Sequence, residues 1–118
     1  MARFVGQRVG SIIVPPFTTM GIERDGEIVA GVVFNHYEGT DVHFTAAGHG
    51  WTRGFLHEVG RYVFDTLGCI RMTAITEQPQ VVRLAQRLGG EVEGLMRDHF
   101  GPGRHAFVVG ILEADYRY

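Results

Sequence analysis

Apolar runs separated by short polar turns predict that the first half of the chain is mostly β-structure. The first strand is expected at 17–23 and the second at 28–35, with Asp25-Gly26 between them as a hairpin turn signal. Residues 28–35 are almost continuously apolar and β-branched, which is typical of a strand covered on both faces. A third strand at 41–46 alternates apolar and polar residues, so His43 is expected on the face opposite its apolar neighbours.

The second half of the chain alternates helices with strands. The expected elements are helices at 52–67 and 79–88, and strands at 69–76, 91–100 and 105–113. Gly68 supplies a left-handed residue that ends the first helix, and Pro79 suits the first turn of the second. Strands first and alternation afterwards predict an α+β fold, a mixed and mostly antiparallel sheet of about six or seven strands with two main helices.

Length and charge indicate one soluble domain. The 118 residues are expected to form a single domain, 1–118. A net charge of −2 gives no general attraction to nucleic acid or to an anionic membrane. The lone cysteine, Cys69, allows no internal disulfide, and neither a signal peptide nor a membrane helix is apparent. We therefore expect a cytoplasmic protein.

The link between the third strand and the first helix has the features of an anion site. A glycine-rich loop at 47–51 leads into the helix at the positive end of its dipole, and we expect the main-chain amides from His49 to Trp51 and at the start of the helix to be unpaired. The Thr52 hydroxyl either caps the helix or donates to a phosphate, and Arg53 adds a positive charge. A tight strand-to-helix turn that binds nothing explains the same glycines.

Several motifs over roughly the last 80 residues stand at the same distances from one another as in a known family pattern. The motifs are Ala47-Gly48-His49-Gly50-Trp51-Thr52, the segment 64–72, Gln78-Pro79-Gln80-Val81, Leu88-Gly89-Gly90 and Glu93-Gly94-Leu95-Met96-Arg97. Together they resemble the acetyl-coenzyme A half of the GNAT family of N-acetyltransferases, closest to its ribosomal-protein-alanine acetyltransferase branch. The first motif resembles the family's pyrophosphate loop, Gln/Arg-x-x-Gly-x-Gly/Ala.

The resemblance implies a sheet with a central, splayed parallel strand pair and direct transfer of an acetyl group from acetyl-coenzyme A to a primary amine. The acceptor, a protein N-terminus, a lysine or a small molecule, is not identified by any motif. The residues expected to hold the coenzyme are Phe44, Thr45, Ala46, Gly48, His49, Gly50, Trp51, Thr52, Arg53 and Gln78.

The sequence also departs from the family pattern. Gln78 replaces an asparagine that helps hold the coenzyme, and Ala85 stands where many members have a tyrosine that protonates the leaving thiolate. The N-terminal region is too short for the helices that normally wall the acceptor site. The acceptor side is then open or completed by a second subunit, and the apolar residues Ile12, Ile13, Val14 and Phe17 favour a homodimer.

The candidate general base is His43, because an imidazole near the cleft titrates in the useful pH range. Asp41, His36 and Glu38 are alternatives, and a solvated strand residue with no chemical role is a further interpretation of His43. The six histidines lack metal-ligand spacing, so no metal is expected.

Two hypotheses of different class remain. The first is an acetyl-coenzyme A-dependent N-acetyltransferase, favoured by the Gly48-His49-Gly50 loop. The second is a catalytically inactive GNAT-like binding or structural protein of phage or prophage origin, favoured by Ala85 and by the altered ends of the loop.

Overall fold

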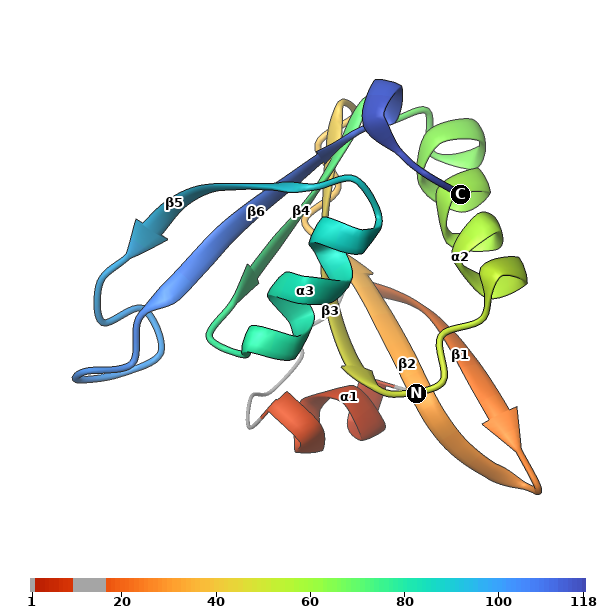
Figure 1. The fold of residues 1–118 in the computed structure, drawn as a ribbon, viewed down its shortest axis with the longest axis horizontal. Coiled ribbons are helices and arrows are strands. Elements are labelled where there is room, and N and C mark those ends of the chain that lie inside the picture. The colour runs from red at the N-terminus through yellow and green to blue at the C-terminus, as the bar shows by residue number, and fades with distance from the viewer. Residues whose placement is uncertain (1, 10–16) are drawn as a thin grey trace.

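The computed structural model describes residues 2–9 and 17–118, which form a six-stranded sheet with helices on both of its faces (Figure 1). The strand order is β1-β2-β3-β4-β6-β5, with β3 and β4 parallel and the other neighbouring pairs antiparallel. The elements are α1 (Ala2–Val9), β1 (Phe17–Arg24), β2 (Glu27–Asn35), β3 (Asp41–Gly48), α2 (Arg53–Gly60), β4 (Arg71–Thr76), α3 (Pro79–Arg87), β5 (Glu91–Met96) and β6 (Ala106–Leu112). A π-helical stretch, Arg61–Thr66, continues α2, and a 3-10 turn, Glu113–Asp115, follows β6.

Most of these elements lie where the sequence predicts them. Two differences have physical causes. Helix α1 was not predicted, because its stability comes from packing Val5 against Val33 and Ala47 rather than from its own short sequence. Strand β5 ends at Met96 rather than at residue 100, because Asp98 takes a positive φ of 56° and begins the hairpin loop. Ile12, Ile13 and Val14, on which the homodimer prediction rests, lie outside the described residues.

The two faces of the sheet are covered differently. Helices α2 and α3 pack on one face, where Phe34, Phe44 and Leu56 belong to the main core cluster. On the other face, Val5 of α1 packs over the β2–β3 region, which buries the middle of β2 on both sides as predicted. Beyond α1, this second face carries the polar side chains of Asp41 and His43 on β3 and of Thr73 on β4.

Strands β3 and β4 pair along only part of their length and then diverge (Figure 1). Their paired residues run from Asp41 opposite Arg71 to Phe44 opposite Ala74. Beyond this point β3 stays with β2 as far as Gly48, and β4 stays with β6 as far as Thr76. The predicted splayed parallel pair is therefore present, and it leaves an opening in the middle of the sheet.

None of the helices in the described part of the chain has the length and hydropathy needed to cross a membrane.

Candidate functional site

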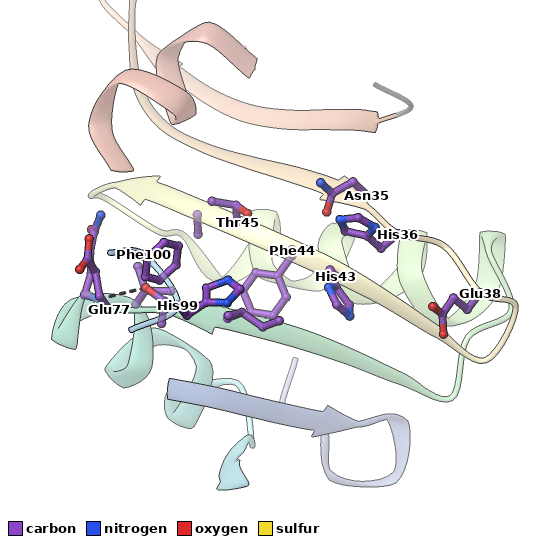
Figure 2. Close-up of a pocket in the computed structure, with 14 residues that line it drawn as sticks. Asn35, His36, Glu38, His43, Phe44, Thr45, Glu77, His99 and Phe100 are labelled. Carbon is purple, nitrogen blue, oxygen red and sulfur yellow. Dashed lines mark hydrogen bonds between the residues drawn. The ribbon is translucent and has the colours of Figure 1, made fainter. Parts of the chain in front are cut away.

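Two cavities meet at the opening between β3 and β4. The first, of about 370 Å³, is lined by His43 and its neighbours on the polar side of the sheet (Figure 2). The second, of about 460 Å³, lies between the loop before α2 and helix α3. Both are lined by Ala46, Gln78 and Val81, so they adjoin each other at this opening. We call them the polar-side cavity and the helix-side cavity.

The helix-side cavity has the electrostatics of an anion site. Its lining includes Arg83 and Arg87 of α3 and contains no Asp or Glu. The Arg24 guanidinium reaches the same loop from β1, where Nη2 donates to the Gly50 carbonyl over 3.2 Å. The α2 N-terminus adds the positive end of a helix dipole. A phosphorylated ligand would therefore meet only positive or neutral groups here.

Side-chain contacts of the loop resolve the alternative that the sequence leaves for Thr52 and show how Trp51 packs. The Thr52 hydroxyl accepts from the Phe55 N–H over 3.1 Å, so it caps α2. The Trp51 ring packs against Phe55 with 5.7 Å between centroids and anchors the helix while lining the cavity. Gly50, with φ +81°, gives the loop its turn.

Two residues of the loop differ from the expected phosphate-binding arrangement. The N–H of His49 donates to the Val29 carbonyl over 3.0 Å, so this amide is used within the fold and the prediction of a free amide at His49 was wrong. At Gly48, a Cβ would lie 2.1 Å from the Val29 oxygen. The missing side chain at Gly48 therefore allows β3 to approach β2. The amides of Gly50, Trp51 and Arg53, in contrast, make no hydrogen bond to any described residue.

The polar-side cavity has the opposite chemistry. Its lining contains three imidazoles, two carboxylates and no Lys or Arg: His36, His43, His99, Glu38 and Glu77 (Figure 2). Three of the four residues considered as base, His43, His36 and Glu38, line this cavity. Asp41 does not line it and contacts His43 instead. A cationic amine fits this set of acceptors and negative charges.

Sequence reasoning missed His99 and Phe100, which line the polar-side cavity from the tip of the β5–β6 hairpin. The tip is attached to the β4–α3 connection by Arg104, whose Nε donates to Glu77 Oε2 over 3.1 Å. Hydrogen bonding from Arg104 lowers the pKa of Glu77, so this carboxylate stays charged. No local sequence signal places a hairpin tip beside a strand end 23 or more residues earlier, although the opposite charges are consistent with the contact.

The other predicted coenzyme-binding residues divide into two groups. Phe44, Thr45 and Ala46 line the polar-side cavity at the opening, and Gln78 lines both cavities. Thr52 and Arg53 line neither, and the Arg53 guanidinium lies 5.2 Å from the centroid of the Tyr118 ring.

Ala85 stands where the GNAT pattern has a tyrosine, and it is fully buried in the core, so this position faces neither solvent nor a ligand. Cys69 is buried as expected, and burial raises the pKa of its thiol. Among the described residues, no group of three or more His, Cys, Asp or Glu side chains is placed to hold a metal ion.

Comparisons with known proteins support the fold. No family model and no curated protein sequence matches the chain. Among solved structures, a variant of the spermidine N-acetyltransferase SpeG from Vibrio cholerae superposes with a TM-score of 0.68 at 17% identity, covering 83% of this chain and 66% of that one. A candidate acetyltransferase from T. thermophilus gives a TM-score of 0.69 at 17% identity, covering 94% and 65% of the two chains.

The chain thus has the GNAT fold of acetyltransferases and spans just under two thirds of the length of these neighbours. At this identity the similarity establishes the fold alone. The ribosomal-protein-alanine branch stays a prediction.

Proposed function

We propose that the protein transfers an acetyl group from acetyl-coenzyme A to a primary amine. The observation that carries the proposal is the pair of adjoining cavities at the opening in the sheet, with arginines lining one cavity and carboxylates and imidazoles lining the other. A phosphorylated thioester fits the helix-side cavity and a cationic amine fits the polar-side cavity, so the two substrates would meet at the opening between β3 and β4.

The residues that would hold the donor are the free amides of Gly50, Trp51 and Arg53 together with Arg83 and Arg87. The edge of β3 beyond Phe44 has no β4 partner, so the backbone groups that point to this edge are available to a ligand in the opening. An amide there would stabilise negative charge on the thioester oxygen during attack. Gln78, which lines both cavities, would contact the ligand where they meet.

His43 would receive the proton released by the attacking amine, since its ring lines the polar-side cavity, where the amine would bind. The polar-side cavity would bind a small cationic amine through Glu38 and Glu77. Several of the structural neighbours are forms of a spermidine N-acetyltransferase, and a polyamine is consistent with these charges. Ala85 favours the second candidate function, a protein that binds the coenzyme without catalysing transfer, because this position carries no phenol to protonate the thiolate.

Calorimetry with acetyl-coenzyme A and its desulfo analogue tests donor binding. Replacing Arg83 by Gln should weaken binding by about five-fold, the effect expected for one exposed charge near a phosphate. The matched control is Arg61→Gln, an exposed arginine that pairs with Glu58 on α2 and does not line the cavity. Equal affinity in the two variants, or no binding by the parent protein, would refute the donor site.

Thiol release with a panel of amines then tests transfer. The sequence contains no lysine, so acetylation of the protein's own side-chain amines cannot contribute to the signal. We expect release that depends on the added amine and falls at least ten-fold in His43→Gln. Tight coenzyme binding with no release for any amine would support the binding-only function.

A further inference from the structure

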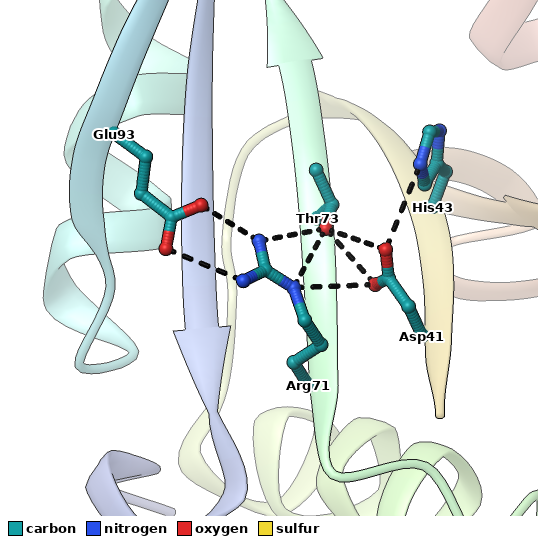
Figure 3. Close-up of polar contacts among 5 residues, drawn as sticks. All are labelled: Asp41, His43, Arg71, Thr73 and Glu93. Atoms are coloured by element: carbon teal, nitrogen blue, oxygen red, sulfur yellow. Dashed lines mark hydrogen bonds and ion pairs between the residues drawn. The ribbon is translucent and has the colours of Figure 1, made fainter.

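Five polar residues form a continuous chain across the polar side of the sheet (Figure 3). They are His43 and Asp41 on β3, Thr73 and Arg71 on β4, and Glu93 on β5. The parallel register explains the first four, since Asp41 lies opposite Arg71 and His43 lies opposite Thr73. This row of polar residues begins with His43 at the polar-side cavity and extends away from the cavity.

The centre of the chain is the Thr73 hydroxyl. It donates to the Asp41 carboxylate, at 2.9 Å from Oδ1 and 3.1 Å from Oδ2, and accepts from Arg71 Nε and Nη2 at 3.2 and 3.1 Å. Arg71 Nε also lies 3.6 Å from Asp41 Oδ1. The carboxylate is therefore fixed on two sides, by a hydroxyl and by a guanidinium.

Glu93 holds the far end, and a glycine makes the contact possible. Arg71 Nη2 donates to Glu93 Oε1 over 2.8 Å, although β6 lies between their strands. The β6 residue at the crossing point is Gly110, where a Cβ would lie 2.3 Å from Glu93 Oε2 and 2.6 Å from Arg71 Nη2. Any other residue would block the ion pair.

We infer that Asp41 is the positioning residue for His43, held in place for that role by Thr73 and Arg71; the inference rests on the proposed transferase function. Asp41 Oδ2 lies 3.8 Å from His43 Nε2, and the two side chains are 20% and 30% exposed. A carboxylate at this nitrogen favours the tautomer with the proton on Nε2 and leaves Nδ1 to accept a proton.

The proton and electron balance is as follows. The amine binds as an ammonium ion and first loses one proton to solvent. The lone pair of the neutral amine then forms a bond to the thioester carbonyl carbon, and the C–S bond breaks with its electron pair going to sulfur. The proton lost by the amine nitrogen passes to His43 Nδ1, and the imidazolium is stabilised by Asp41. Solvent then returns a proton to the thiolate and removes one from His43.

Other charged and titratable groups also face His43. The His36 ring lies 5.2 Å from it, and Glu38, Glu77 and His99 line the same cavity. None of these is in contact with Thr73, so the variants below change the Asp41 side of the ring alone.

The test compares Asp41→Asn with Glu93→Gln. Asp41→Asn removes the carboxylate 3.8 Å from His43 Nε2, so the neutral ring should lose its preference for a proton on Nε2. We expect the ¹⁵N NMR signals of His43, assigned with His43→Gln as a reference, to show the Nε2–H tautomer in the parent protein and a larger share of the Nδ1–H tautomer in Asp41→Asn. In turnover, kcat should fall about ten-fold while the KM for the amine stays within two-fold.

Glu93→Gln keeps the Asp41 carboxylate, so the His43 tautomer should stay as in the parent protein even if the fold is weakened. Thr73→Val should reproduce part of the loss in kcat, and Thr73→Ser should restore it because it keeps the hydroxyl. An unchanged His43 tautomer in Asp41→Asn, or the same tautomer mixture in Asp41→Asn and Glu93→Gln, would overturn the inference. The NMR measurement needs no turnover, so it decides the role of Asp41 even if no amine is acetylated and the proposed function fails.

Discussion

The glycine loop allows a sharp test, because Gly48 and Gly50 both have positive φ but face different surroundings. An alanine at either position costs about 1–2 kcal/mol for the left-handed backbone. At Gly50, the added Cβ would meet only the Arg24 side chain at 3.4 Å, and that side chain is flexible and exposed. Gly50→Ala should therefore fold and lose about 1–2 kcal/mol.

At Gly48 the same methyl group would lie 2.1 Å from the Val29 carbonyl oxygen. An ordinary contact needs about 3.5 Å, so β2 or β3 must move by more than an ångström. The strands resist this movement because the N–H of the next residue, His49, bonds to the same oxygen. Strain of this kind adds about 1–3 kcal/mol, and we expect a total loss of about 2–5 kcal/mol for Gly48→Ala.

Both variants change the unfolded chain in the same way, so the difference between them isolates the contact with Val29. At about 4 °C per kcal/mol for a chain of this size, Gly48→Ala should melt roughly 4–12 °C below Gly50→Ala. Urea unfolding and differential scanning calorimetry measure this difference. Equal stabilities would refute the close approach of the two strands at Gly48.

Two further predictions concern the hairpin tip and the C-terminal segment. Arg104→Gln should release the tip from Glu77 and raise the KM for the amine several-fold without changing the affinity for desulfo-coenzyme A, whereas Arg97→Gln, an exposed arginine of the same hairpin, should change neither. Tyr116→Phe removes a hydrogen bond to the Leu56 carbonyl and should cost about 1 kcal/mol at pH 8. Burial raises the pKa of Tyr116, so the stability that its phenol contributes is complete below pH 10 and is lost as the pH rises further. The difference in unfolding free energy between wild type and variant, measured with urea, should therefore shrink at pH 11. A constant difference would argue against a buried phenol.

Much of the fold follows from local patterns that the sequence displays. The alternation in β3 correctly places His43 opposite the core residues Val42 and Phe44, and the continuous apolar run correctly marks β2 as covered on both faces. These patterns are informative because strand side chains alternate with period two whatever the rest of the chain does.

Features that depend on distant contacts could not be read in this way. The His49 amide was expected to be free, but its use by Val29 is set by the register between β2 and β3. The place of Phe100 in the cavity depends on an ion pair across the fold, and the role of Gly110 depends on two side chains from other strands. Each of these is a tertiary relation with no signature in the residues next to it.

The short pairing between β3 and β4 has a mechanical consequence. It joins two leaves of the sheet, β1-β2-β3 and β4-β6-β5, at one end only, so within the sheet any change in the width of the opening is a rotation about that end. Thr73 and Asp41 bridge the leaves at this pivot and line neither cavity. The Thr73 hydroxyl and the Asp41 carboxylate would then set the width of the opening, and with it the distance between two bound substrates, without contacting either substrate.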